Sequence, residues 1–205
     1  MDGGIAHGSV IPVGGNNITS DIAAGLRTPV AEADRLKRLS GCALGRLVSD
    51  DEEIEVPGVG GHAPRRCARR VLSDIIEPRA EEMFAAIRKR IEDTGLLEQL
   101  SAGAVLTGGA VLLEGMTEFA EEVLGMPVRI GFPTGVKGIT QLVQGPQFST
   151  GVGLVKFGAQ AIIEARIREA MPAHSMTRLV SQRGAHQPEA EVRRSGFWEW
   201  IKQAF

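Results

Sequence analysis

The longest regular pattern of apolar positions in the chain covers residues 71–93. Within it, apolar side chains recur at steps of three and four residues: Leu72, Ile75, Ile76, Met83, Phe84, Ile87 and Ile91. This spacing places them on one face of a helix and predicts a long helix packed against a core. Pro78 lacks a backbone N–H, so we expect it to bend or restart this helix.

Two shorter helices are predicted before it, over residues 17–26 and 29–40. Thr28 is expected to cap the second helix, because Pro29 suits the first helical position and a threonine hydroxyl can accept from the first turn. Gly41 should end that helix.

Alternating apolar residues and glycines predict strands in two early segments. Residues 3–13 are expected to form a strand or hairpin, and we expect this strand to be cut from a larger sheet because a strand needs a neighbour. Residues 42–48 and 52–56 are predicted to pair as a hairpin, followed by a glycine-rich loop over residues 57–64.

The second half of the chain alternates strands and helices. Residues 104–106 and 128–130 are short apolar runs, separated by a glycine turn at 107–109 and a helical pattern over 113–124. Strand, glycine turn, helix and strand in this order predict an α/β layer. A last helix of the body is expected over residues 150–170.

The C-terminal 35 residues differ in composition from the body. Residues 171–195 are poor in aromatics and rich in polar residues and glycine, which predicts a disordered linker. Residues 196–205 then form an amphipathic helical pattern, whose apolar side carries five large side chains: Phe197, Trp198, Trp200, Ile201 and Phe205. The predicted organisation is therefore a body over 1–170, a linker over 171–195 and a terminal helix over 196–205.

Composition and charge narrow the function classes. The chain has 205 residues, 43% of them hydrophobic, and a net charge of −2, which argues against a nucleic-acid partner bound by bulk electrostatics. Residues 171–205 hold five Lys/Arg and three Asp/Glu, so this tail carries +2 and the body −4. Without a leader pattern or a long apolar run, we expect a cytoplasmic protein whose tail suits an anionic surface.

Two glycine turns are candidate ligand sites. Thr107-Gly108-Gly109-Ala110 follows an apolar strand, and Gly14-Gly15-Asn16 precedes a helix. Glycine lets the backbone approach a ligand closely, although each turn could equally be a tight connection without a ligand. Asp34 and Lys37, three apart on one helical face, could be a surface ion pair or could hold a ribose and a phosphate. Neither the two cysteines nor the four histidines show metal-ligand spacing.

The order of these segments resembles the second lobe of the actin and Hsp70 ATPase superfamily, and within it the FtsA family of cell-division proteins. The resemblance covers residues 5–160 nearly continuously and rests on eight motifs: VIPVGGN (10–16) with ITSDIA (18–23), LRTP (26–29), GCALG (41–45), IIEPR (75–79), LTGGA (106–110) with EG (114–115), and FSTGVGL (148–154). It implies an α/β actin-like (ribonuclease H-like) ATPase lobe made of subdomains IIA and IIB.

The resemblance also implies a nucleotide site for ATP with magnesium in the full-length family. Gly108 and Gly109 would pack against adenine and ribose, Gly14, Gly15 and Asn16 would lie near the nucleotide, and Lys37 would contact the ribose side. The family usually has glutamate where this sequence has Asp34. The family's phosphate loops would precede residue 1, so we expect half a site, with weak or absent ATP binding and no hydrolysis by this chain alone.

A protein partner and a membrane are implied as well. In the family, subdomain IIB docks the C-terminal peptide of the tubulin-like protein FtsZ, and four basic residues are candidates for meeting its carboxylates: Arg79, Arg88, Lys89 and Arg90. Arg193 and Arg194 flank the terminal helix, which would bind the membrane weakly alone and more strongly when an actin-like polymer displays many copies.

These implications predict a protein that tethers the FtsZ ring to the cytoplasmic face of the inner membrane at the division septum, together with other division proteins. Two alternatives are a shape-determining filament protein related to MreB and a sugar kinase of the same superfamily. The motif IIEPR and the terminal helix favour the FtsA family, since a sugar kinase needs no such helix and the chain shows no convincing catalytic aspartate.

Overall fold

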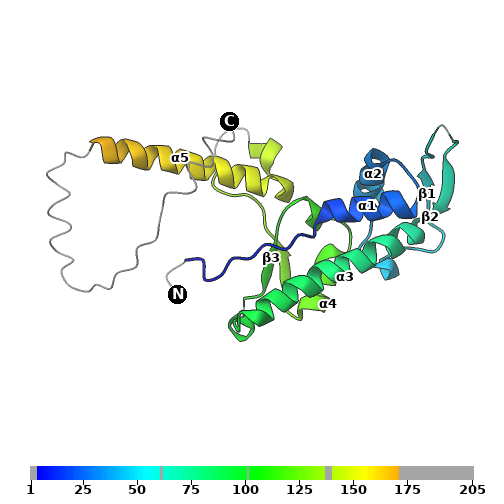
Figure 1. The fold of residues 1–205 in the computed structure, drawn as a ribbon, viewed down its shortest axis with the longest axis horizontal. Helices are drawn as coiled ribbons and strands as arrows, with labels where there is room; N and C mark the ends of the chain where they lie inside the picture. The colour runs from blue at the N-terminus through cyan, green and yellow to red at the C-terminus, as the bar shows by residue number, and fades with distance from the viewer. Residues whose placement is uncertain (1–3, 61, 101, 137–139, 171–205) are drawn as a thin grey trace. The chain divides into compact units, whose positions relative to one another are not determined.

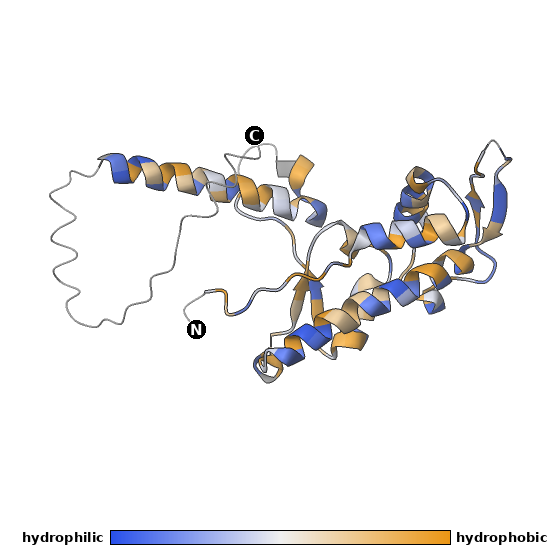
Figure 2. Cartoon of the chain, viewed as in Figure 1, coloured by the Kyte–Doolittle hydropathy of each residue, from blue (hydrophilic) through white to orange (hydrophobic). Residues whose placement is uncertain are grey.

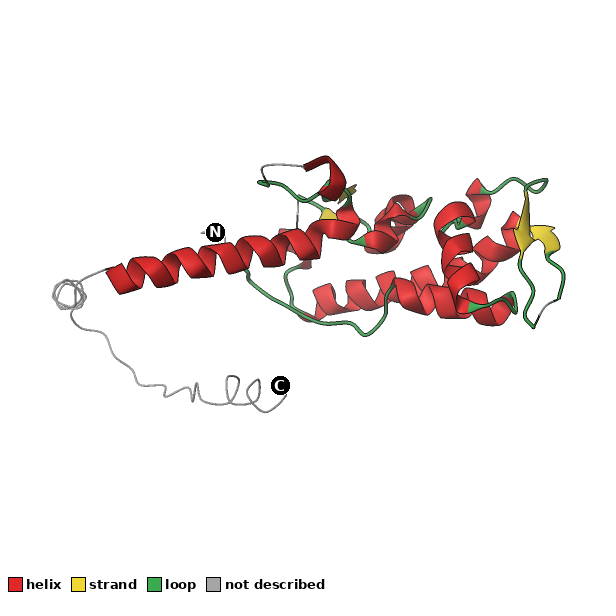
Figure 3. Cartoon of the chain, turned by 90° about the horizontal axis from the view of Figure 1, so that it is seen from above, coloured by secondary structure: helices red, strands yellow, loops and turns green. Residues whose placement is uncertain are grey.

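The computed structural model describes residues 4–60, 62–100, 102–136 and 140–170. Its internal contacts divide the chain into two units, Met1–Phe157 and Gly158–Phe205, and the division falls within the last helix. Helices make up most of the described chain, and the strands are short (Figure 3). The helices and strands are α1 (Gly15–Gly25), α2 (Val30–Ser40), β1 (Glu53–Val56), β2 (Arg65–Ala68), α3 (Arg69–Asp93), β3 (Ala104–Leu106), α4 (Met116–Leu124), β4 (Val128–Ile130) and α5 (Ser149–Ala170).

The core of the first unit lies where α1 and α4 pack against α3 (Figure 1). Ile18 and Ile22 of α1 are buried, and the rings of Phe84 on α3 and Phe119 on α4 lie 6.1 Å apart at 57°. Polar and apolar stretches alternate along α3 (Figure 2), because its apolar residues recur at helical spacing and only one face is buried. The predicted long helix is therefore confirmed, and it begins two residues earlier than expected.

Pro78 does not restart α3, which continues as one helix from Arg69 to Asp93. The two shorter predicted helices are confirmed as α1 and α2, with Gly41 at the end of α2. Thr28 does not cap α2, so that prediction was wrong. Pro29 occupies the capping position, and the Thr28 hydroxyl instead donates to the carbonyl oxygen of Pro57 at 2.8 Å, which ties this corner to the loop after β1.

The strand predicted for residues 3–13 is wrong over the residues that the structure describes. None of the described strands pairs with residues 4–13, and Ile5 and Val10 are 92% and 88% exposed. Alternation of apolar residues favours a strand only where a neighbouring strand can accept its backbone hydrogen bonds.

The second strand of the predicted hairpin pairs with a different segment, so the prediction that residues 42–48 are its partner was wrong. Residues 53–56 form β1 as expected, but β1 pairs antiparallel with β2, with Glu53 opposite Ala68 and Val56 opposite Arg65. The glycine-rich segment 57–64 connects these two strands. Residues 42–44 are instead buried in the core, where Cys42 forms a single parallel bridge to Glu114. The sequence of β2, Arg-Arg-Cys-Ala, has no apolar alternation that would have identified it.

The strands predicted at 104–106 and 128–130 are confirmed as a parallel pair, β3 and β4, connected through α4. Ala104 lies opposite Val128, and Leu106 opposite Ile130. The predicted last helix is confirmed as α5. The arrangement is the α/β class that the sequence predicts, and it places the glycine turn at the end of β3 near the beginning of α1. The predicted linker and terminal helix, residues 171–195 and 196–205, lie outside the described residues.

Candidate functional site

A cavity of about 650 Å³ lies where the beginning of α1, the middle of α2 and the turn after β3 meet. All seven residues predicted to bind a nucleotide line it: Gly14, Gly15, Asn16, Asp34, Lys37, Gly108 and Gly109. A second cavity of about 430 Å³ shares Gly15, Lys37 and Gly109 with the first and adds the apolar side chains of Leu112 and Leu113. Both volumes fall in the range of small-ligand sites.

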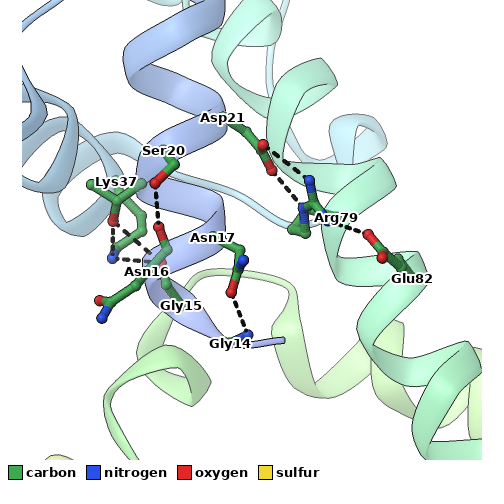
Figure 4. A network of polar contacts seen from close by, with 10 residues as sticks. Gly14, Gly15, Asn16, Asn17, Ser20, Asp21, Lys37, Arg79 and Glu82 are labelled. Atoms are coloured by element: carbon green, nitrogen blue, oxygen red, sulfur yellow. Dashed lines mark hydrogen bonds and ion pairs between the residues drawn. The ribbon is translucent and has the colours of Figure 1, made fainter. Parts of the chain in front are cut away.

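The first turn of α1 faces the cavity. Gly14 precedes the helix in an extended conformation, and its N–H donates to the Asn17 side-chain oxygen at 2.9 Å (Figure 4). Gly15 and Asn16 are the first helical residues, so their N–H groups point out of the helix end and have no partner within the helix. These N–H groups and the helix dipole favour a negatively charged ligand group.

Gly15 also sets how closely the two sides of the cavity approach. A Cβ at Gly15 would lie 3.3 Å from the Cβ of Ala110, which belongs to the turn after β3. This distance is tighter than most real contacts, so a side chain at Gly15 would push the two sides apart. Ile18, one turn later and 1% exposed, anchors the same helix in the core.

Lys37 reaches from α2 to the first turn of α1 (Figure 4). Its ammonium lies 2.9 Å from Asp34 Oδ1, and the second Asp34 oxygen lies 3.0 Å from the Arg38 guanidinium. The hydrogen bond from Lys37 lowers the pKa of Asp34 against the opposing effect of burial, and the positive charges of Lys37 and Arg38 lower it further. Lys37 and Asp34 therefore form a closed ion pair at the cavity wall.

The opposite wall is built from backbone. Gly108 has φ 99° and ψ 176°, a conformation open only to glycine, and its N–H donates to the carbonyl oxygen of Pro146 at 3.1 Å. Thr107 completes the turn, since its hydroxyl donates to the carbonyl oxygen of Gly131 at 2.9 Å and lies 2.7 Å from the Ser149 hydroxyl. The glycine is required here by the turn itself.

The donor set suits an anion-bearing ligand more than a metal ion. The cavity offers the backbone N–H groups of α1 and the cations Lys37 and Arg38. Asp34 is the one carboxylate among its lining residues, and each of its oxygens already lies against a cation. These residues fit the phosphates and sugar of a nucleotide, whereas they offer magnesium no uncommitted carboxylate.

Sequence reasoning missed two residues that shape the cavity. Asn17 caps the first turn of α1, and a second asparagine directly after Gly-Gly-Asn was a signal for such a cap. Thr19 is 5% exposed and contacts Lys37, Asp34 and Gly15. Its signal was weaker: a lone hydroxyl among the apolar positions of the helix.

The four predicted partner residues divide into two pairs. Arg79 is bound to Asp21 at 2.6 and 3.1 Å and to Glu82, and Arg88 is bound to Glu92 at 2.8 Å and to the carbonyl oxygen of Val123 at 2.9 Å (Figure 4 for Arg79). Both arginines thus stabilise helix contacts of α3.

Lys89 and Arg90 form no ion pair among the described residues, and they line a cavity of about 420 Å³ together with residues 11–13. The five predicted membrane residues, Phe197, Trp198, Trp200, Ile201 and Phe205, lie outside the described residues. Among the helices that are described, none combines the length and the apolar character needed to cross a membrane.

The fold is similar to that of two solved bacterial structures. MreB 5 of Spiroplasma citri bound to AMPPNP matches with a TM-score of 0.57 at 14% identity, over 78% of this chain and 47% of that one. The same protein bound to ADP matches with a TM-score of 0.54 at 13% identity, over 77% and 47%. The fold of this chain is therefore that of the actin-like proteins.

The sequence comparisons define the family. The family model of cell division protein FtsA matches residues 1–153. FtsA of Pseudomonas aeruginosa is 44% identical over 78% of this chain and 38% of its own length, and FtsA of Escherichia coli K12 is 39% identical over 83% and 43%. FtsA of Agrobacterium fabrum is 33% identical over 100% of this chain and 44% of its own length. The chain belongs to the FtsA family and spans about two fifths of the length of these relatives.

Proposed function

We propose that this chain supplies one side of an ATP site in a cell-division protein that links FtsZ to the membrane. The observation that carries the ATP part is the cavity of about 650 Å³, because seven residues from three separate segments of the sequence converge on it. The MreB 5 structures with the same fold were solved with AMPPNP and ADP, both adenine nucleotides. The family favours this function over the sugar-kinase and MreB-like alternatives.

The two walls would hold different parts of the ligand. The N–H groups of Gly15 and Asn16, with the positive end of α1, suit a phosphate. The turn at Gly108 and Gly109 offers a flat backbone surface without side chains, which suits the sugar and the base. Lys37 belongs to the wall formed by α1 and α2, and its ammonium lies 3.1 Å from the carbonyl oxygen of Gly15. We propose that this chain alone binds ATP weakly and does not hydrolyse it, because Asp34, the one carboxylate that lines the cavity, is already engaged by Lys37 and Arg38 and cannot also hold a metal ion.

An NMR titration with ATP tests this proposal. We expect the amide signals of Gly15, Asn16, Gly108 and Gly109 to shift at millimolar ATP. Lys37→Gln should weaken binding because it removes the cation at the cavity wall. Lys89→Gln removes a cation on α3 outside this cavity and should leave binding unchanged. The absence of any shift in these four amides would contradict the proposed site. A micromolar dissociation constant would contradict the proposal that this chain alone binds ATP weakly.

For the partner, we propose that the acidic C-terminal peptide of FtsZ docks near Lys89 and Arg90. These two cations line a cavity together with residues 11–13 and one carboxylate, Asp93, whereas Arg79 and Arg88 are engaged with residues of this chain. A double variant, Lys89→Glu with Arg90→Glu, should weaken peptide binding several-fold in a fluorescence anisotropy titration. Arg35→Glu reverses an exposed charge on α2 and serves as the control. Equal peptide affinity in the double variant and the control would contradict this docking site.

For the membrane, we propose that residues 196–205 attach the protein to anionic lipid at the cytoplasmic face of the inner membrane, at the division septum. Two tryptophans, two phenylalanines and an isoleucine in these ten residues support an interfacial helix. Trp198→Glu should reduce flotation with anionic liposomes, most clearly in a self-associated, actin-like polymer that displays many tails. Gln203→Glu adds the same charge on the polar side and should reduce it less. Full flotation of the Trp198 variant would contradict the anchor.

A further inference from the structure

The Lys37 ammonium has a protein acceptor for each of its three protons. It lies 3.1 Å from the carbonyl oxygen of Gly15, 2.6 Å from Thr19 Oγ1 and 2.9 Å from Asp34 Oδ1. The Lys37 side chain is only 14% exposed. A lysine side chain is long and flexible, so three acceptors on two helices fix a group that would otherwise sample many rotamers. We call these four residues the Lys37 clamp.

Thr19 is the member of the Lys37 clamp whose hydroxyl contacts all three of the others. It is 5% exposed and lies one turn after Gly15 on α1. Its hydroxyl accepts from Lys37 and can donate its own proton to the carbonyl oxygen of Gly15 at 3.2 Å or to Asp34 Oδ1 at 3.4 Å. Thr19 is not among the residues that line the cavity, so any effect on a ligand must pass through its neighbours.

The clamp also fixes the direction of an N–H group at the cavity. The carbonyl of Gly15 and the N–H of Asn16 belong to one planar trans peptide, so they point in opposite directions. Lys37 donates to that carbonyl oxygen at 3.1 Å, and Thr19 can donate to it at 3.2 Å. The Asn16 N–H already points out of the first turn of α1, and these hydrogen bonds hold its peptide in that direction at the cavity that Asn16 lines.

We infer that Thr19 is a positioning residue of the nucleotide site. Its hydroxyl holds the Lys37 ammonium and the Gly15–Asn16 peptide in place before a nucleotide enters, so that binding does not have to order them. This inference rests on the proposed ATP site and adds to it a residue that touches no ligand. It predicts that removing one hydroxyl, with side-chain shape retained, lowers nucleotide affinity through the mobility of Lys37.

The first test needs no ligand. Thr19→Val removes the hydroxyl and keeps the branched shape, whereas Thr19→Ser keeps the hydroxyl. Competitive acetylation of the chain, read by mass spectrometry, compares the reactivity of Lys37 with that of exposed Lys89 in each variant. We expect Lys37 to become about fivefold more reactive in Thr19→Val, which corresponds to the loss of one hydrogen bond, and to be unchanged in Thr19→Ser. Unchanged Lys37 reactivity in Thr19→Val, in a sample with wild-type circular dichroism, would overturn the inference.

The second test adds ATP and follows the amide signals of Gly15 and Asn16. The apparent dissociation constant should rise about tenfold in Thr19→Val and recover in Thr19→Ser. If the wild type shifts with ATP and Thr19→Val binds equally well, the positioning role is overturned while the ATP site stands. If the wild type shows no shift, the ATP site fails and the positioning role fails with it, whereas the acetylation result still decides whether Thr19 holds Lys37.

Discussion

The two walls of the cavity are built in opposite ways. The wall formed by α1 and α2 depends on side chains, because Lys37, Thr19 and Asp34 join the helices and Ile18 and Ile22 anchor α1 in the core. The wall formed by the turn after β3 depends mainly on backbone, because the N–H groups of Gly108 and Gly131 donate to the carbonyl oxygens of Pro146 and Leu106, with one side-chain hydrogen bond from Thr107. The first wall should therefore respond to side-chain chemistry and the second to backbone conformation.

The largest expected difference is in the loss of unfolding free energy when an apolar side chain of α1 or of β3 is truncated. Ile22 on α1 is fully buried in the core, whereas Val105 on β3 is 52% exposed. Ile22→Ala should lower the free energy of unfolding by about 2–5 kcal/mol because it leaves a cavity in the core. Val105→Ala should cost less than about 1 kcal/mol. Urea titrations followed by circular dichroism measure both values, and equal losses would show that β3 is as well supported as α1.

A glycine on each wall separates backbone from side-chain effects. Gly108→Ala forces a Cβ onto a backbone at φ 99°, which should cost about 1–3 kcal/mol of unfolding free energy. Gly14→Ala, at φ −165° with open space around the added Cβ, should cost less than about 1 kcal/mol. Thermal unfolding of the two variants gives the comparison. A Gly108 variant as stable as the Gly14 variant would mean that the turn can adopt another conformation.

The link from α1 to α3 is expected to have a smaller effect. Asp21 and Arg79 are 30% and 28% exposed and join the two helices, so Asp21→Asn should cost about 1 kcal/mol. Asp74→Asn removes a pair within α3, between Arg70 and Asp74, and should cost a few tenths of a kcal/mol. Chemical denaturation measures both. A larger loss for Asp74 would contradict the assigned role of the cross-helix pair.

The smallest expected effect concerns the pH dependence of stability. The hydrogen bond from Lys37 lowers the pKa of Asp34 in the folded chain below its ordinary value of 3.8. The stabilisation is therefore present above that value and is lost as the pH falls through the lower pKa of the folded state. Asp34→Asn should reduce the loss of unfolding free energy between about pH 5 and pH 2. The reduction should be only a few tenths of a kcal/mol, because the Asp34 side chain is 37% exposed. Asp50→Asn, on an exposed turn, is the control, and an equal reduction there would contradict the effect.

Helical periodicity was sufficient to predict most of this fold. The apolar spacing of α3 predicted its length within two residues, and the order of strand, turn, helix and strand predicted the α/β layer to which β3 and β4 belong. The partner of β1 was missed because β2 begins with two consecutive arginines and lacks apolar alternation, so its pairing depends on tertiary contacts. Residues 4–13 show the reverse error, since local alternation predicted a strand that has no partner in the described structure.

The candidate site was predictable where motifs carried it. The two glycine turns and the Asp34–Lys37 spacing were ambiguous alone, and the family resemblance assigned seven residues to a nucleotide site. These seven are half of the residues that line the cavity. Thr19 was missed, because its role depends on the packing of α1 against α2 and no spacing in the sequence shows it. The engagement of Arg79 and Arg88 was missed for the same reason: a charge on a helix face shows no partner until the neighbouring helix is in place.

Cys42 gives this chain an intrinsic reporter of local opening. The thiol is fully buried and burial raises its pKa, while the carbonyl of the same residue accepts from Ser73 of α3 at 2.9 Å. Alkylation of Cys42 therefore requires residues 42–44 to separate from α3, whereas Cys67 on β2 is only partly buried. Because these are the two cysteines of the chain, the ratio of their alkylation rates reports how often residues 42–44 open away from α3, without any introduced label.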